Sequence, residues 1–273
     1  MQNIFTTPEP VELYVEIGGG SVNVRADEVS ETTVDVDGPN AEEVTVEQRG
    51  NQIVVIAPHR RAGFLSGSND YRVAVTVPTD SELITKTGSA DLVAQGRYGS
   101  TKVKSGSGEV RIEEVAKDAA VDTGSGDIQI ARSLADVRVK TGSGEVTIGS
   151  TGRSAAVSTG SGDVSLGTTG GSVVVKSGSG DVQVKDARED LSITTASGDL
   201  TVGAIRSGGV HAKAVSGDVH IGIPAGIPVW TDISCVSGRV SSNLEGAGEP
   251  TDGQAFIEVR AKTVSGSIHL EQL

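Results

Sequence analysis

Residues 105–112 read Ser-Gly-Ser-Gly-Glu-Val-Arg-Ile, and this phrase recurs with small changes from residue 87 to residue 200. Its acidic residue returns every 18 residues, and Asp218 follows after one inserted residue. A constant period of this kind is typical of a repeat architecture in which each repeat forms one structural unit. The acidic residues at the constant spacing are Asp91, Glu109, Asp127, Glu145, Asp163, Asp181 and Asp199.

Each repeat contains two segments in which apolar and polar residues alternate. Val164 and Leu166 stand one and three positions after the acidic residue, with a polar residue between them. Val173 and Val175 precede the next corner with the same spacing. A period of two predicts a strand with one buried face. We therefore predict two short strands per repeat, joined by the Ser-Gly-Ser-Gly corner and by a looser corner such as residues 149–154.

One repeat is too small to bury its own apolar residues, whereas a stack of repeats buries them between neighbours. The sequence therefore predicts an all-β chain that forms a single elongated β-solenoid, or β-helix, with about 18 residues per coil and parallel, in-register ladders. Equivalent residues of successive coils are expected about 4.8 Å apart. The 37 glycines suit the corners, where positive φ or close backbone approach is needed.

The regularity of the repeat changes along the chain and predicts three segments. Residues 1–80 contain divergent N-terminal strands and a cap, with a loop at 57–70. Residues 81–222 carry the regular 18-residue repeats, and residues 223–273 form irregular C-terminal coils and a cap. The residues assigned to the C-terminal cap are Trp230, Phe256 and Ile257.

The column of acidic residues needs electrostatic relief. Unit charges about 4.8 Å apart repel by roughly 0.9 kcal/mol even in water. Hydrogen bonds from corner amides, exposure to solvent and a neighbouring lysine column each offer relief, and we favour a solvated, amide-bonded column that needs no cofactor. Calcium binding is the alternative, although the spacing differs from the calcium-binding nonapeptide repeat. The calcium candidates are Asp127, Glu145, Asp163 and Asp181.

A second polar column precedes each glycine corner. Its position shares the parity of the buried strand residues, so we interpret these hydroxyls as internal corner groups bonded to backbone rather than as a flat ice-binding face. The column comprises Thr87, Ser105, Thr123, Thr141, Thr159, Ser177 and Thr195.

The segment from residue 57 to residue 70 interrupts the strand pattern. It combines a local positive cluster with an apolar pair, and such loops often carry function. Two interpretations remain open: a surface loop, or a contact for an acidic partner or for a second copy of the chain. The contact residues would be His59, Arg60, Arg61, Phe64 and Leu65.

Composition excludes several classes of partner. The formal net charge of −13 argues against nucleic acid and anionic membrane surfaces. Cys235 is the only cysteine, so no intrachain disulfide forms, and we expect a buried, inert thiol. No signal peptide or transmembrane segment is visible. We therefore expect a cytoplasmic protein without membrane insertion; a surface location would need another start site or non-classical export.

Four features together resemble a known bacterial family: the opening run of short strands, the strand at Val75–Pro78, the Ser-Gly-Asp-Val units and the terminal phrase at Thr263–Ile268. The chain is similar over nearly its whole length to the putative-adhesin β-strand-repeat family of actinobacterial type, a domain of unknown function. The resemblance implies a β-solenoid and gives no catalytic residues.

The leading functional hypothesis is a non-catalytic scaffold or protein-interaction module of adhesin-like type, with an unidentified protein partner or self-association. The alternatives are a polysaccharide-active β-helix enzyme and a calcium-stabilised repeat protein. Carboxylates on one face could cleave a glycan, but aromatics are only 3% of the residues and lie near the ends. Three histidines point outward by parity without the spacing of a metal motif, namely His211, His220 and His269.

Overall fold

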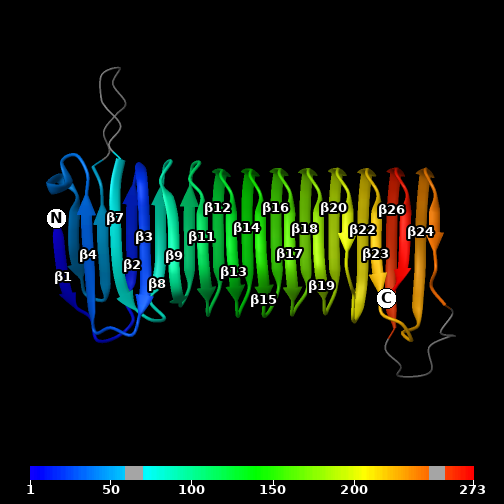
Figure 1. Ribbon diagram of the computed structural model, residues 1–273, viewed down its shortest axis with the longest axis horizontal. Coiled ribbons are helices and arrows are strands. Elements are labelled where there is room, and N and C mark those ends of the chain that lie inside the picture. The colour runs from blue at the N-terminus through cyan, green and yellow to red at the C-terminus, as the bar shows by residue number, and fades with distance from the viewer. Residues whose placement is uncertain (59–69, 246–255) are drawn as a thin grey trace, which may run out of the picture. The chain divides into compact units, whose positions relative to one another are not determined.

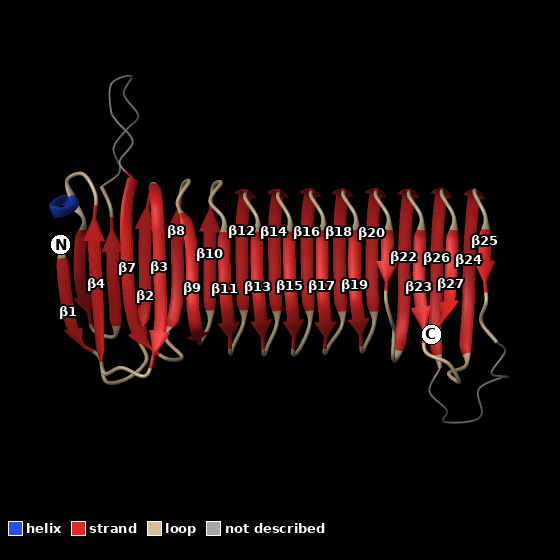
Figure 2. Ribbon diagram, in the orientation of Figure 1, coloured by secondary structure: helices blue, strands red, loops and turns tan. Residues whose placement is uncertain are grey.

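The computed structural model describes residues 1–58, 70–245 and 256–273. The chain divides into two compact units, residues 1–135 and 136–273. Strands dominate both units, and a 3₁₀ turn, Ala41–Glu43, lies between β4 (Glu31–Asp37) and β5 (Thr45–Arg49) (Figure 2). The predicted β-solenoid is confirmed. The predicted boundaries at residues 80 and 222 concern the regularity of the repeat rather than compactness, and they stay a prediction.

In unit 1 the strands form two sheets, seen as neighbouring arrows in Figure 1. Sheet A contains the strands that follow the acidic corners. Its order is β1 (Gln2–Thr6), β4 (Glu31–Asp37), β7 (Asp70–Pro78), β3 (Gly19–Asp27), β9 (Asp91–Tyr98), β11 (Val110–Val115) and β13 (Ile128–Ser133). The order in sheet B is β12 (Ala119–Ser125), β10 (Thr101–Ser105), β8 (Glu82–Thr87), β2 (Glu12–Ile17), β6 (Gln52–Ile56) and β5 (Thr45–Arg49).

Unit 2 has the same two-sheet plan. Its sheet A runs β15 (Val146–Thr151), β17 (Val164–Thr169), β19 (Val182–Ala187), β21 (Leu200–Val202), β23 (Val219–Ile223), β27 (Ile268–Gln272) and β25 (Val240–Ser242). Its sheet B runs β14 (Val137–Ser143), β16 (Ala155–Ser161), β18 (Val173–Ser179), β20 (Leu191–Ser197), β22 (Gly208–Ser216), β26 (Ile257–Ser265) and β24 (Val229–Ser237).

The regular coils pair in parallel with a register of one repeat. Val164 lies opposite Val182, and Val182 lies opposite Leu200, so each inward column is a ladder of aliphatic side chains. These three side chains are no more than 1% exposed. Removal of this apolar surface from water is the main stabilising contribution of the stack.

The glycine before each acidic residue is required by the close approach of successive coils. Gly162 has a φ of +118°, and a Cβ added there would lie 2.2 Å from the backbone oxygen of Gly144. A side chain at this position is therefore excluded by both conformation and space. This requirement explains why the Ser-Gly-Ser-Gly corner recurs so strictly.

The N-terminal strands depart from the simple parallel stack. β2 and β3 form a coil that pairs in parallel with β8 and β9, so the divergent first coil belongs to the solenoid. Beyond it, β1 pairs with β4, β4 with β7, and β5 with β6, all antiparallel. An antiparallel edge ends the parallel ladders at this end of unit 1.

At the C-terminal end, coil order differs from chain order. β26 and β27 lie between the β22–β23 coil and the β24–β25 coil, although they come last in the sequence (Figure 1). Ile257 and Val259 of the inserted coil are fully buried. In the outer coil, Thr231 is exposed and Cys235 is half-buried. The more apolar coil thus takes the inner position, which buries more apolar surface.

This inversion changes the environment of four residues discussed above. Cys235 is half-buried rather than buried, because its coil has a neighbour on one side only. Ile257 belongs to the buried interior of β26, while Trp230 and Phe256 are about half exposed, at 50% and 48%. The prediction of a buried thiol at Cys235 is therefore wrong.

Candidate functional site

The acidic column is bonded to backbone amides. In unit 2, the Asp163 carboxylate accepts the amide N–H of Asp181 at 2.8 Å, and the Asp181 carboxylate accepts that of Asp199 at 2.8 Å. The Asp91 carboxylate in unit 1 accepts the amide N–H of Glu109 at 2.9 Å. Each of these three aspartates therefore bonds the corner of the next coil, which is the amide-bonded arrangement favoured by the sequence.

The calcium candidates share this column. Asp127 lies in unit 1, and Glu145, Asp163 and Asp181 lie in unit 2. Within the described ranges, no group of three or more His, Cys, Asp or Glu side chains could hold a metal ion. Calcium binding at these four residues stays a prediction from the sequence.

The polar column before each glycine corner is internal. Thr141 is 7% exposed and donates a hydrogen bond from Oγ1 to the backbone oxygen of Ser143 at 2.8 Å. Thr159 and Ser177 donate to the equivalent oxygens at 2.9 and 3.0 Å. These hydroxyls bond the turn of their own coil, so the internal interpretation is confirmed and the ice-binding one is wrong.

The positive loop cluster cannot be placed. His59, Arg60, Arg61, Phe64 and Leu65 lie outside the described residues. Contact through this cluster stays a prediction.

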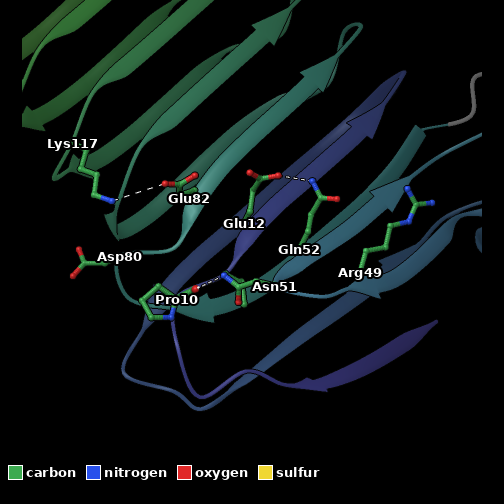
Figure 3. A pocket seen from close by; sticks show the side chains of 9 residues that line it. Pro10, Glu12, Arg49, Asn51, Gln52, Asp80, Glu82 and Lys117 are labelled. Atoms are coloured by element: carbon green, nitrogen blue, oxygen red, sulfur yellow. Dashed lines mark hydrogen bonds and ion pairs between the residues drawn. The ribbon is translucent and has the colours of Figure 1, made fainter.

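A polar hollow of about 500 Å³ lies in unit 1 beside the starts of β2, β6 and β8 (Figure 3). Glu12 receives a hydrogen bond from Gln52, and Glu82 lies 3.9 Å from the Lys117 ammonium. The Arg97 guanidinium donates hydrogen bonds to both carboxylate oxygens of Asp80, and these hydrogen bonds raise the pKa of Arg97. Because the three carboxylates already have partners, this hollow offers little free charge to a ligand.

A second hollow, of about 320 Å³, lies on the outer face of sheet B in unit 2. Gly209 leaves a gap in the outward row between Asp190 and Glu258, and an added Cβ there would lie 3.5 Å from the Glu258 backbone oxygen. His211 and Arg260 border the gap. The hollow thus combines carboxylates with a guanidinium and an imidazole.

Basic side chains stand in rows on this outer face. Lys213 of β22 lies directly opposite Lys262 of β26, and Lys176 of β18 stands two strands away in the same row. Like charges on neighbouring strands destabilise a sheet unless they are neutralised. Lys262 lies 3.5 Å from Asp232, whereas Lys176 and Lys213 form no ion pair within residues 1–58, 70–245 and 256–273. The other basic residues of this face are Arg138, Lys140 and Arg260.

The acidic corner and the outer face of sheet B therefore differ in charge in unit 2. The acidic corner of sheet A carries Asp163, Asp181, Asp199 and Asp218 in one column. Sheet B carries the basic rows instead. The chain combines a strongly negative total charge with one locally positive face, an arrangement that the net charge alone hides.

A histidine pair on sheet A of unit 2 was not anticipated from the sequence. The rings of His220 and His269 stack with centroids 5.9 Å apart. His220 Nε2 lies 2.8 Å from Glu271, whereas His269 Nδ1 lies 2.5 Å from the Ser241 hydroxyl. Serine and carboxylate thus contact different rings, so they do not form a Ser-His-acid triad. Both histidines stand two residues beyond the corner of their coil. This shared position predicts their contact only when the two coils are known to be neighbours.

One buried tyrosine stands out in unit 1. β9 contains a bulge at the level of Ile112 and Glu114 of its neighbour β11, and Tyr98 closes this widened coil. Its hydroxyl donates to the backbone oxygens of Val24 and Gln95, at 2.8 and 2.9 Å. Burial raises the pKa of Tyr98 well above its usual value, because the phenolate would lose its hydration. Tyr98 has a structural role.

Three solved structures resemble the chain with low identity. A putative cell adhesion protein from Clostridium sporogenes is 12% identical, with 100% of this chain and 99% of that chain covered and a TM-score of 0.26. A putative lipid binding protein from Parabacteroides distasonis is 14% identical, with 99% and 96% covered and a TM-score of 0.46. A putative adhesin from Bacteroides fragilis is 15% identical, with 99% and 96% covered and a TM-score of 0.33.

No curated protein matches the sequence significantly. In the part of the chain that the structure describes, no helix has the length and apolar character needed to cross a membrane. The family comparison is decisive, because the Toastrack DUF4097 profile matches residues 11–271, which is nearly the whole chain. The chain belongs to the Toastrack DUF4097 family.

Proposed function

We propose that this chain is a non-catalytic, adhesin-like interaction scaffold that binds an acidic protein partner through the outer face of sheet B in unit 2. The observation that carries the proposal is the row of Lys176, Lys213 and Lys262, which the register of the strands holds in line. A repetitive rigid face favours several weak contacts at once, and such contacts multiply into useful avidity.

The charge distribution supports an acidic partner. Lys213 and Lys262 face each other on neighbouring strands, so a carboxylate placed between them would relieve their repulsion. Both side chains are exposed. Exposed charges contribute mainly to association rate and selectivity, so binding should weaken as salt screens the interaction.

Retention on immobilised poly-glutamate tests this proposal. Lys176→Glu, Lys213→Glu and Lys262→Glu together should abolish retention at moderate salt. The matched control reverses three exposed cations away from the basic rows, Lys185→Glu, Arg188→Glu and Arg239→Glu, and should keep most of the retention. Equal losses for the two triple variants would show that total charge, rather than the row, governs binding.

The non-catalytic part of the proposal has its own test. The family profile and the solved relatives carry adhesion or binding descriptions, or none, rather than the name of an enzyme. Incubation with a panel of acidic glycans should release no reducing ends. Release that disappears on replacing outward carboxylates would overturn the scaffold proposal in favour of a glycan-cleaving β-helix. The cytoplasmic location expected from the sequence stays a prediction, which fractionation of cells with a tagged copy would test.

A further inference from the structure

The outer edge of unit 2 is open in both sheets. β24 is the last strand of sheet B and β25 the last strand of sheet A, and within the described residues neither has a partner on its outer side. Ile193, Ala212, Ala261 and Ile233 form one inward column across β20, β22, β26 and β24. The first three are 0% exposed, whereas Ile233 is only half-buried. Among the described residues, the core therefore continues to this edge without being closed there.

The unpaired backbone groups of β24 can be identified. The Pro228 oxygen accepts the Ile257 amide N–H at 2.9 Å, so the even-numbered residues of β24 direct their backbone groups toward β26. In a strand these groups alternate in direction, so those of Thr231, Ile233 and Cys235 point to the open edge. An edge of this kind is a template for pairing with another chain.

The requirements of this edge favour a second solenoid end over a single peptide. A lone strand could extend sheet B or sheet A, but it would leave the other edge open. A partner that extends both sheets must present two strands at the same separation. The same end of a second copy does so under a twofold axis perpendicular to the sheets, which reverses strand direction and sets β24 antiparallel to its counterpart.

We propose that two copies of this chain associate end to end through β24, in an antiparallel register centred on Ile233. This register places Trp230 opposite the partner's Val236, Asp232 opposite the partner's Ser234, and Thr231 opposite the partner's Cys235. A register centred on Asp232 would oppose two aspartates, and one centred on Ser234 would oppose Asp232 to the partner's Val236. The Ile233 register avoids both mismatches.

Exposed apolar side chains gather at this end, as the proposal requires. Trp230 is 50% exposed and Val236 is 79% exposed, and the two lie on the same outward face of β24. Val264 continues the row of Val236 on β26 and is 50% exposed. In β16 and β18 the same position is glycine, at Gly160 and Gly178. Val215 of β22 extends this row and is 57% exposed, so the apolar surface spans the last coils of unit 2. Pairing at β24 would bring Trp230 beside the partner's Val236 at the edge of this surface.

Disulfide capture tests the register. Thr231→Cys introduces a thiol opposite the partner's native Cys235, where Cα atoms of a hydrogen-bonded antiparallel pair are about 5.5 Å apart, a spacing that disulfides accept. Under mild oxidation this variant should form a covalent dimer almost completely. The control Val229→Cys lies on the same inward face, but in this register it stands opposite the partner's Ser237 rather than opposite a thiol. It should therefore crosslink at least tenfold more slowly. Equal crosslinking of both variants would overturn the register.

Light scattering tests the association itself. The unmodified chain should have twice the 27.8 kDa mass of one copy, and Val236→Lys should halve the measured mass, because a lysine on an edge strand disfavours pairing with another chain. A monomer at every soluble concentration, or higher polymers that indicate head-to-tail contacts, would overturn the proposal. Far-ultraviolet circular dichroism would show that Val236→Lys still folds. Thr231→Cys and Val229→Cys lie on the inward face and leave the outward basic rows unchanged, so poly-glutamate retention of these two variants separates failure of this inference from failure of the proposed function.

Discussion

The coil made by β20 and β21 and the coil made by β24 and β25 belong to the same stack, yet they bury their inward residues to very different degrees. Ile193 and Ile233 stand in one column, and the first is fully buried while the second is half-buried. The two coils have the same alternation of residues. The difference is that β20 has a strand on both sides and β24 on one.

This contrast shows that burial in the solenoid is a property of position in the stack rather than of the repeat. An inward residue needs coils above and below to exclude water. The end coil therefore keeps the chemistry of a core without its closure. Such an end is either a site of association or a liability that the protein must manage.

The largest expected difference is between Ile193→Ala and Ile233→Ala. The buried substitution should lower the free energy of unfolding by about 2–5 kcal/mol, because it leaves a cavity. Ile233→Ala, at the half-buried position, should lower the free energy of unfolding by less than about 1 kcal/mol when Val236→Lys keeps the end unpaired. Urea unfolding of both variants in that background measures the pair. Equal losses would contradict the assignment of β24 to the edge.

The next effect compares two glycines of unit 2. Gly162→Ala should lower the free energy of unfolding by about 1–3 kcal/mol, because the position has a positive φ and the added Cβ would lie 2.2 Å from the Gly144 backbone oxygen. Gly209→Ala should change it by no more than about 0.5 kcal/mol, since its Cβ meets only ordinary contacts. Thermal denaturation by circular dichroism compares the two. A tolerated Gly162→Ala would mean that the coils are further apart than the structure places them.

A third prediction concerns the bulged coil of unit 1. The pKa of Tyr98 is raised in the folded state above its usual value of 10.0, so its contribution to stability is complete below pH 10 and declines as pH rises further. Tyr98→Phe should cost about 1 kcal/mol at pH 7 through the lost hydrogen bonds. Between pH 10 and pH 11.5, the free energy of unfolding should fall less steeply for Tyr98→Phe than for the unmodified chain, because phenylalanine does not ionise. Urea unfolding midpoints of both proteins, measured across this pH range, test the prediction. The same pH dependence in Tyr98→Phe and in the unmodified chain would show that Tyr98 ionises freely in the fold.

The smallest effect concerns the acidic column. Asp181→Ala removes the acceptor for the Asp199 amide and should cost about 0.5–1.5 kcal/mol. Asp181→Asn keeps an acceptor oxygen and relieves repulsion, so it should be neutral within about 0.5 kcal/mol. Melting temperature measures both. A large loss with Asn, together with a rise in melting temperature on adding calcium to the unmodified chain, would instead favour the calcium alternative.

Much of the fold could be predicted from the 18-residue period. Val164, Leu166, Val173 and Val175 identify the two strands of a coil because a period of two has one physical interpretation. The parity of Thr141 correctly predicted an internal hydroxyl. These successes depend on local patterns that repeat without interruption.

The C-terminal arrangement could not be predicted because it depends on a choice between two similar coils. The sequences around Ser237 and Ser265 do not indicate which of the two coils lies inside. Only the greater apolar surface of Ile257 and Val259, compared with Thr231 and Cys235, favours the inner position for the last coil. The prediction for Cys235 was wrong for this reason. The contact between His220 and His269 was hidden for the same reason, and the basic rows were obscured by the total charge.

Distances between spin labels along the outward column of sheet A test the stacking order most directly. In a Cys235→Ser background, one label replaces Thr147 and the second replaces Thr201, His220, His269 or Ser241 in turn. The strand order predicts separations that grow by about 4.8 Å per coil, to roughly 14, 19, 24 and 29 Å in that sequence of sites. The contradictory result would be a label at residue 241 closer to residue 147 than one at residue 269, or separations with no constant increment.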